Sequence, residues 1–259
     1  MIFDTHMHCN FSCDSHMKYE DAIKRGREEN IGITITEHWD YDYPTNPDMF
    51  LFDLDEYMAW AKKYRSENIL YGIEIGMQRQ TAQRDEKIAA GYDFDYVLAS
   101  IHCMGGVDIY EPHCYEGRNR KDIIDEYLAD AIYCLKEHEN FDAFAHIDYI
   151  CRYWPYQGAE KELRLEDNPE GFDKLFKLLI AKNKPMEINT RRLDDEKAYA
   201  GLVPLYARYK ALGGKFVTIG SDAHHAEHVG RRIDLAMQMA QDLGLVPVYF
   251  KKRKQYLME

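Results

Sequence analysis

Two histidines separated by one residue stand almost at the N-terminus, in the stretch Asp4-Thr5-His6-Met7-His8. Residues 1–5 have the character of a short apolar strand, and side chains two positions apart in a strand point to the same side. His6 and His8 could therefore bind one metal ion, with Asp14 available from the loop that follows. A pair this short also occurs at strand ends where both histidines are merely solvated, so the pair alone favours neither interpretation.

Candidate ligands of the same kind recur where later apolar runs of the sequence end. Each carries an imidazole or a carboxylate, and they are His38, His102, His146, Asp222 and His224, with Glu74 inside a run of its own. An isolated glutamate in an apolar strand is costly to bury unless a cation pairs with it. These ligand types suit zinc, iron or manganese, and they are too many for one ion. The sequence therefore predicts more than one bound metal ion.

The runs that carry these residues alternate with segments of helical character. Strands are predicted at residues 1–5, 31–38, 69–76, 95–102, 141–148, 185–190 and 215–220, with an edge strand at 248–250. Helices are predicted at 19–29, 54–65, 81–90, 122–135, 171–182 and 229–243, and another begins at Val203-Pro204 and ends at Gly213-Gly214. This alternation predicts βαβ units in a parallel sheet, and seven such strands fit a barrel. Functional groups of such barrels gather at the C-terminal strand ends, where the candidate ligands lie.

Composition restricts the classes of protein to which the chain can belong. A chain of 259 residues with 46% hydrophobic content is long enough for a sizeable core, and one domain over residues 1–259 is expected. Lys and Arg total 33 against 45 Asp and Glu, a net charge of −12, so there is no basic surface for nucleic acid or an anionic membrane. No run approaches the roughly 18 apolar residues of a membrane span, and the N-terminus lacks a signal-peptide pattern. A cytoplasmic protein is expected.

The candidate ligands stand in motifs that resemble one superfamily. The motifs are Asp4-x-His6-x-His8, Thr36-Glu37-His38, Glu74, Ser100-Ile101-His102, His146-Ile147-Asp148 and Gly220-Ser221-Asp222-Ala223-His224. Nearly from end to end, they resemble the polymerase and histidinol phosphatase (PHP) superfamily. Residues 105–108, 141–148 and 187–190 are most similar to its monofunctional histidinol-phosphatase branch. The resemblance implies a distorted (β/α)7 barrel, similar to a TIM barrel, with a trinuclear metal site at the C-terminal ends of the strands.

The resemblance also assigns the ligands to three divalent ions, each zinc, iron or manganese. The first ion would be bound by His6, His8, Glu74 and Asp222; the second by Glu74, His102 and His146; the third by Asp14, His38 and His224. Glu74 would bridge two ions, which explains how a carboxylate can be buried in an apolar strand. His16, His113, His138, His225 and His228 fall outside the pattern, and of these His225 and His228 are expected nearest the site.

The activity implied by the resemblance is hydrolysis of a small phosphomonoester. L-histidinol phosphate, an intermediate of histidine biosynthesis, is the preferred substrate. Clustered ions would generate a nucleophile and neutralise phosphoryl charge. Asp222 or Glu37 could position the water or pass a proton, and the sequence does not decide between them. Two rivals stay open: a phosphatase or phosphodiesterase acting on nucleotides or oligonucleotides, and a non-catalytic metal-binding protein.

Three arginines are candidates for binding the substrate phosphate. Arg191-Arg192-Leu193 stands where the branch often has small residues followed by leucine, and Arg152 lies just past the fifth predicted strand. A planar guanidinium suits phosphate oxygens, although each arginine could equally be a solvated surface residue. Recognition of histidinol is then expected from carboxylates or aromatic side chains in the loops at residues 40–48 and 110–116.

Overall fold

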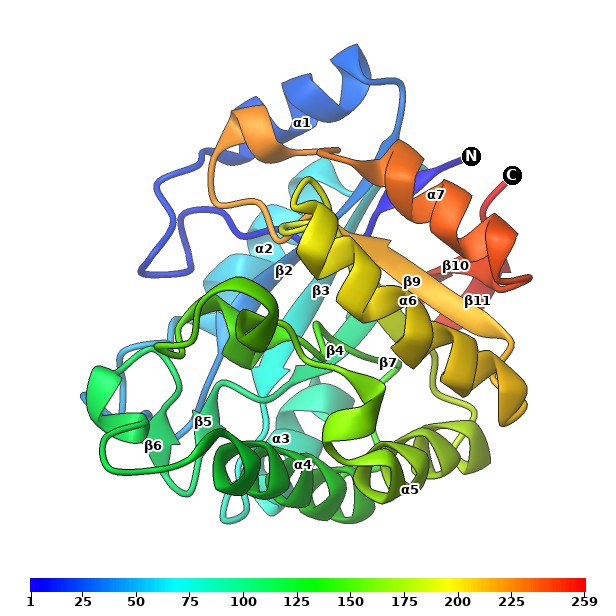
Figure 1. Ribbon diagram of the computed structural model, residues 1–259. Helices are drawn as coiled ribbons and strands as arrows, with labels where there is room; N and C mark the ends of the chain where they lie inside the picture. The colour runs from blue at the N-terminus through cyan, green and yellow to red at the C-terminus, as the bar shows by residue number, and fades with distance from the viewer.

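The computed structural model describes residues 1–259, with side chains for residues 1–158 and 160–259. Its central feature is a curled parallel sheet (Figure 1). The strands, in the order in which they neighbour one another, are β1 (Phe3–Asp4), β2 (Gly32–Trp39), β3 (Ile69–Gly76), β4 (Tyr96–Ser100), β7 (Ala143–Phe144), β8 (Met186–Asn189) and β9 (Phe216–Gly220). The strands β2 and β3 are buried along their whole length, as expected of strands covered on both faces.

The two ends of this sheet meet and close it into a barrel. The amide of Thr5 donates to the carbonyl of Ile219 over 2.9 Å, and the amide of Asp222 donates to the carbonyl of His6 over 2.8 Å. Met7 also forms an isolated parallel bridge with Ala223. The predicted distorted seven-stranded barrel is therefore confirmed, and its closure brings the first and last ligand segments side by side.

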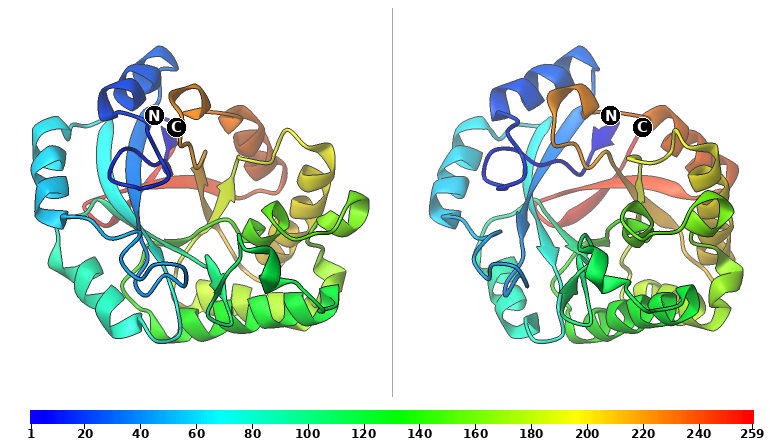
Figure 2. Two further views of the ribbon diagram at one scale, coloured as in Figure 1. Left: turned by 90° about the vertical axis from the view of Figure 1, so that its left-hand side faces the viewer. Right: turned by 60° about the vertical axis from the view of Figure 1, so that its left-hand side comes forward.

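Helices surround the sheet, as the two turned views show (Figure 2). They are α1 (Tyr19–Glu28), α2 (Leu54–Tyr64), α3 (Ala82–Gly91), α4 (Arg120–Glu137), α5 (Pro169–Ala181), α6 (Glu196–Ala211) and α7 (Ile233–Asp242). Short 3-10 turns follow several strands, at Pro112–Cys114, Tyr149–Arg152, Gly158–Lys161, Leu165–Asp167 and Ala226–His228, and a small hairpin joins β5 (Cys103–Met104) to β6 (Val107–Asp108). Within the described residues, none of these helices has the length and apolar character that a membrane crossing needs.

Several predicted boundaries are wrong, among them the start of α6 and the end of β7. The helix α6 begins at Glu196, because the side chain of Asp195 accepts hydrogen bonds from the amides of Lys197 and Ala198 and fixes the first turn there. Pro204 lies inside this helix and not at its start. The strand β7 covers only Ala143–Phe144, since the chain beyond it turns and the amide of Tyr149 donates to the carbonyl of His146.

The C-terminal segment is larger than the predicted edge strand. β10 (Val246–Lys251) pairs in parallel with β9 over two residues and then in antiparallel with β11 (Lys254–Leu257). Figure 2 shows β10 running across the barrel. Val248 and Phe250 pack there in a separate apolar cluster with Tyr96, Leu98, Ala143 and Ala145. Because Tyr96 and Ala143 are the first residues of β4 and β7, the hairpin covers the N-terminal end of the barrel, opposite the ligand-bearing end.

Candidate metal centre

The carboxylate of Glu74 is the centre of a cluster of imidazoles at the C-terminal end of the barrel. Glu74 is fully buried in β3, where it stands opposite His38 of β2. Its Oε2 atom lies 3.3 Å from His6 Nε2, 3.4 Å from His8 Nε2 and 2.9 Å from His38 Nδ1, and its Oε1 atom lies 3.3 Å from His102 Nε2 and 2.9 Å from His146 Nε2. Five imidazoles from four strand ends, those of β1, β2, β4 and β7, therefore converge on one carboxylate.

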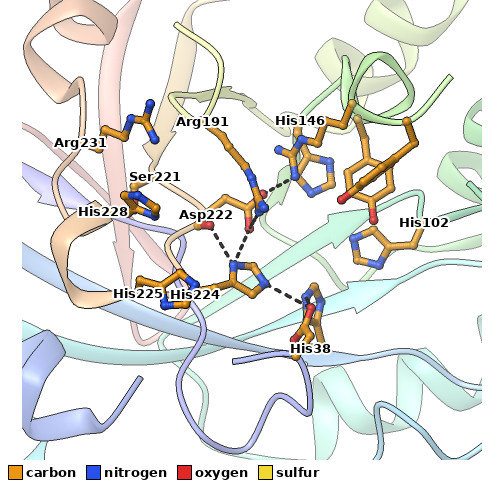
Figure 3. A pocket seen from close by; sticks show the side chains of 14 residues that line it. His38, His102, His146, Arg191, Ser221, Asp222, His224, His225, His228 and Arg231 are labelled. Atoms are coloured by element: carbon orange, nitrogen blue, oxygen red, sulfur yellow. Dashed lines mark hydrogen bonds and ion pairs between the residues drawn. The ribbon is translucent and has the colours of Figure 1, made fainter. Parts of the chain in front are cut away.

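Two further carboxylates complete the cluster. Asp14 Oδ2 lies 3.5 Å from His38 Nε2 and 3.2 Å from His224 Nε2. Asp222 Oδ1 lies 3.8 Å from His6 Nε2, 3.4 Å from His8 Nε2 and 3.6 Å from His224 Nδ1. Figure 3 shows His38, His102, His146, Asp222 and His224 gathered round one space. The structure thus brings all nine predicted ligands together.

Hydrogen bonds behind the cluster fix the orientation of several imidazoles. His6 Nδ1 lies 2.8 Å from Glu187 Oε1, and His102 Nδ1 lies 2.6 Å from Asp40 Oδ2. A carboxylate only accepts hydrogen bonds when ionised, so these Nδ1 atoms carry the donated proton and each Nε2 atom turns toward the cluster. Carboxylates that hold the far nitrogen in this way are typical of metal-binding histidines.

Buried atoms in the cluster lack the partners that their burial requires. Glu74 Oε2, His38 Nδ1 and His102 Nε2 are buried close to polar neighbours but form no well-aligned hydrogen bond, and His6 Nε2 lies only 3.0 Å from His8 Nε2. An unpaired buried polar atom costs free energy. Two facing imidazole nitrogens cannot both present lone pairs to each other unless a cation lies between or beside them. Several groups of three such residues have their ligand atoms within 4.8 Å of one another. This set of imidazoles and carboxylates therefore fits divalent metal ions.

Burial and neighbouring charges shift the pKa values of the cluster and so determine which of its atoms carry protons in the metal-free protein. Burial raises the pKa of Glu74, but attraction to His6 and His102 outweighs burial and holds it well below its usual range. Burial lowers the pKa of His102, and the Asp40 and Glu74 carboxylates outweigh this and raise it to about 9. The pKa of His8 falls well below its usual value, first through burial and then through repulsion by neighbouring imidazoles. Protons and metal ions therefore compete for the same nitrogens.

A cavity of about 440 Å³ opens beside the cluster. Its lining combines metal-ligand candidates with arginines and tyrosines: Asp14, His38, His102, His146, Tyr149, Arg152, Tyr153, Arg191, Ser221, Asp222, His224, His225, His228 and Arg231. This volume lies in the range of small-molecule sites. Arg152 donates to Asp222 Oδ2 over 2.6 Å and to Asn189 Oδ1 over 3.1 Å, and Arg191 Nη1 lies 3.6 Å from Asp222 Oδ1.

Sequence comparison places these residues in a known family. A model of the PHP domain matches residues 4–191, a range that includes seven of the nine candidate ligands. The chain belongs to the PHP domain family. Asp222 and His224 lie beyond the matched range, and the barrel closure described above carries them to the same site.

Relatives of this PHP protein match it over nearly its whole length. A probable histidinol-phosphatase of Clostridium acetobutylicum is 42% identical over 253 residues, 98% of each chain. A histidinol-phosphatase of Lactococcus lactis subsp. lactis is 31% identical over 93% of this chain and 91% of its own. The crystal structure of histidinol phosphate phosphatase from Lactococcus lactis subsp. lactis, complexed with zinc, L-histidinol and phosphate, superimposes with a TM-score of 0.92 at 28% identity and 98% coverage of both chains.

Two predicted functional residues of the PHP protein have structural partners instead. Arg192 donates to Asp148 over 3.0 Å and to both oxygens of Glu162 over 2.8 and 2.7 Å, and it does not line the cavity. Its guanidinium is therefore engaged away from any phosphate. Glu37 is fully buried, and its Oε2 atom accepts hydrogen bonds from the amides of Cys9 and Ser12 and from the Ser12 hydroxyl.

Glu37 also accepts a hydrogen bond from the Tyr19 hydroxyl, so both of its oxygens are occupied. These bonds hold the loop that carries Asp14, which gives Glu37 a structural task. Of the two proton carriers that the sequence left open, the geometry favours Asp222, because Asp222 lines the cavity and Glu37 does not.

Sequence reasoning missed several residues that shape the site. Glu187 in β8 is fully buried, contacts His6 through Oε1 and accepts from the amide of His146 through Oε2. It stands in an apolar strand as Glu74 does, and the same argument could have found it. Nothing in the sequence pattern distinguishes Asp40 from other loop carboxylates. Arg231 and Tyr149 lie in turns, where spacing carries no signal.

The histidines outside the strand-end pattern divide as expected. His225 and His228 line the cavity. His138, in contrast, lies at the end of α4, where its Nε2 atom is 2.9 Å from Asp85 Oδ2.

Proposed function

We propose that this PHP protein hydrolyses L-histidinol phosphate to L-histidinol and orthophosphate with three divalent metal ions in its site. The observation that carries the proposal is the match over 98% of both chains to a histidinol phosphate phosphatase crystallised with zinc, L-histidinol and phosphate. The site supports it independently, since nine candidate metal ligands and the cavity arginines Arg152 and Arg191 suit a doubly charged phosphate ester.

Within this proposal the ligands divide into three groups, two of which share Glu74. His6, His8, Glu74 and Asp222 would bind one ion; Glu74, His102 and His146 a second; and Asp14, His38 and His224 a third. The distances support the first two groups, because Oε2 of Glu74 faces His6 and His8 whereas Oε1 faces His102 and His146. His38 Nδ1 also lies 2.9 Å from Oε2, and its Nε2 atom faces Asp14 of the third group. When bound, the ions would neutralise phosphoryl charge and acidify a water molecule.

Side chains of the protein would orient the substrate and the water. Arg152 and Arg191 both reach the cavity beside Asp222, and their guanidinium groups would hold two phosphoryl oxygens. Burial raises the pKa of Asp222, but attraction to Arg152 and His6 outweighs burial and keeps it well below its usual range. Asp222 therefore stays a carboxylate at neutral pH, so it can orient the attacking water through an accepted hydrogen bond.

A panel of phosphate esters tests the proposed function. Metal-analysed protein would be assayed for orthophosphate release from L-histidinol phosphate, a nucleoside monophosphate, glycerol 3-phosphate and a terminally phosphorylated oligonucleotide. We expect the highest kcat/KM with L-histidinol phosphate. A higher value with the nucleotide or oligonucleotide would replace the proposal by the nucleotide-directed alternative, and release from none of the esters would favour a non-catalytic metal-binding protein.

Three sequence-based expectations belong to the same proposal. They are one domain over residues 1–259, a cytoplasmic location and no nucleic-acid partner. The net charge of −12 supports the last of these, because a nucleic-acid backbone is bound mainly through positive charge. Limited proteolysis, cell fractionation and a filter-binding assay would test them in turn.

A further inference from the structure

The cavity beside the metal cluster has two walls of different chemistry. One wall is cationic or polar and comes from the segment after β9, with His225, His228 and Arg231. Figure 3 shows His228 and Arg231 on the side of the cavity away from His102 and His146. The other wall is aromatic and contains Tyr149 and Tyr153.

The aromatic wall continues outward from the metal ligands as a series of ring contacts. The ring of Tyr149 lies 5.0 Å from that of His102 and 4.8 Å from that of His146. Tyr153 follows at 5.3 Å from Tyr149, and Tyr110 follows at 5.1 Å from Tyr153. Tyr110 is 60% exposed, so the series runs from buried metal ligands to the surface.

Local structure holds the first two tyrosines of this wall in place. Tyr149 begins the turn Tyr149–Arg152, whose residues Ile150 and Cys151 are fully buried. The amide of Tyr153 donates to the carbonyl of Ile150 over 3.2 Å. The guanidinium of Arg152 also lies 5.0 Å from the ring centre of Tyr149, so the turn presents a phosphate-binding candidate and the aromatic wall together.

We infer that Tyr149, Tyr153 and Tyr110 form the subsite for the alcohol part of the substrate, selecting phosphomonoesters whose alcohol carries a flat ring or a cationic group. This inference rests on the proposed function. Aromatic rings stack with flat rings, and their faces attract cations. Arg231 on the opposite wall is paired with Asp194, so the preference for the tyrosines rests on the ring faces themselves.

Substitution of Tyr153 tests the subsite, because Tyr153 is the middle ring and contacts none of the candidate metal ligands in the ring series. We expect Tyr153→Leu to lower kcat/KM for L-histidinol phosphate about tenfold, with glycerol 3-phosphate hydrolysis changed less than about twofold. Tyr153→Phe should retain the wild-type preference, because the ring is kept. Tyr110→Leu should have a smaller effect in the same direction, since Tyr110 is mostly solvated.

Tyr156→Leu is the matched control. Tyr156 stands three positions further along and packs against Trp154 at 5.3 Å, outside the cavity lining. Its variant should behave as wild type on both esters. Metal content and melting temperature would be measured for every variant, so that a folding defect in Tyr153→Leu is recognised.

Calorimetric binding of L-histidinol separates this inference from the proposed function. Tyr153→Leu should weaken binding of L-histidinol about tenfold whether or not the protein hydrolyses the phosphate ester. Equal losses on both esters, or unchanged L-histidinol affinity, would overturn the aromatic subsite. A loss of preference in Arg231→Met or His228→Ala, with Tyr153→Leu unaffected, would place the alcohol on the cationic wall instead. Wild-type protein inactive on L-histidinol phosphate but binding L-histidinol through Tyr153 would overturn the function alone.

Discussion

The two ends of the barrel both contain buried charges, but the charges are satisfied in different ways. At the N-terminal end, Asp142 accepts hydrogen bonds from the amide of Val97 and from Arg253, and the rest of the Arg253 guanidinium donates to Ala89 and Asn140. At the C-terminal end, Glu74 Oε2 and His102 Nε2 form no well-aligned hydrogen bond. Complete pairing indicates a structural role, whereas convergent unpaired atoms indicate a place for a ligand.

The largest effect is expected from Glu74→Gln at the unpaired end. The neutral amide keeps the shape of the side chain but removes the charge that would bridge two ions, so turnover should fall at least about a hundredfold. Bound metal, measured by elemental analysis after reconstitution, should fall with it. His225→Ala is the control, because His225 lines the cavity but is not among the nine ligands. Comparable losses in both variants, with folding intact, would mean that Glu74 is not the bridge.

At the paired end, Arg253→Met should affect stability and leave chemistry alone. The substitution leaves the Asp142 carboxylate, which is 7% exposed, without its cationic partner, and we expect a loss of about 2–3 kcal/mol in the free energy of unfolding. Lys251→Met removes an ion pair with Glu67, which is 89% exposed, and should lower the free energy of unfolding far less, because solvent screens the pair. Urea denaturation measures both. A large fall in kcat/KM for folded Arg253→Met would show that the two ends are not independent.

The arginines near the cavity extend the same contrast to neighbouring residues. Arg191 lies at the cavity and is 41% exposed. The variant Arg191→Ala should have a kcat/KM about ten- to a hundredfold lower for every phosphomonoester, while its metals stay bound. Arg152→Ala should lose a similar factor. Arg192→Ala should instead lower the melting temperature, because it leaves Glu162 and Asp148 unpaired. Wild-type kinetics in Arg152→Ala and Arg191→Ala would mean that the metal ions alone hold the phosphate.

The same pair of neighbours shows which parts of the site the sequence can predict. Ligands at strand ends are predictable, since period-two alternation and repeated apolar runs are local patterns that dictate where a side chain emerges. Arg191 and Arg192 are adjacent and chemically identical, and only the position of Glu162, brought close by folding, separates a cavity arginine from a paired one. Local pattern carries no information about such contacts.

The fold likewise has parts that local sequence patterns predict and parts that depend on long-range contacts. Alternating strands and helices predicted the barrel, because each βαβ unit is a local repeat. Of the C-terminal hairpin only an edge strand at 248–250 was predicted, because its pairing with β9 and its packing against Tyr96 and Ala143 are long-range contacts of a short, partly charged segment. The start of α6 was misplaced because Pro204 is an expected first helical residue, whereas the cap at Asp195 lies two turns earlier.

The smallest expected effect is a proton count at the unpaired end. In the metal-free protein the pKa of His102 is raised to about 9 by Asp40 and Glu74 against the lowering effect of burial, so its imidazole is protonated at pH 7. A metal ion at its Nε2 atom must displace that proton, so binding at pH 7 should release about one proton from this residue. The release should persist at lower pH and vanish as pH rises through about 9, where the imidazole is already neutral. Titration calorimetry of zinc in buffers of different ionisation enthalpy measures it.

Asp40→Asn provides the comparison for this count, because it removes one of the two carboxylates that raise the pKa of His102 and leaves the predicted ligands in place. Its proton release should decline at a lower pH than in the wild-type protein. Paired carboxylates at the N-terminal end offer no such exchange, since their partners are protein groups that do not leave. No proton release at pH 7, in a protein that binds zinc, would show that the cations between these imidazoles are not protons in the metal-free state.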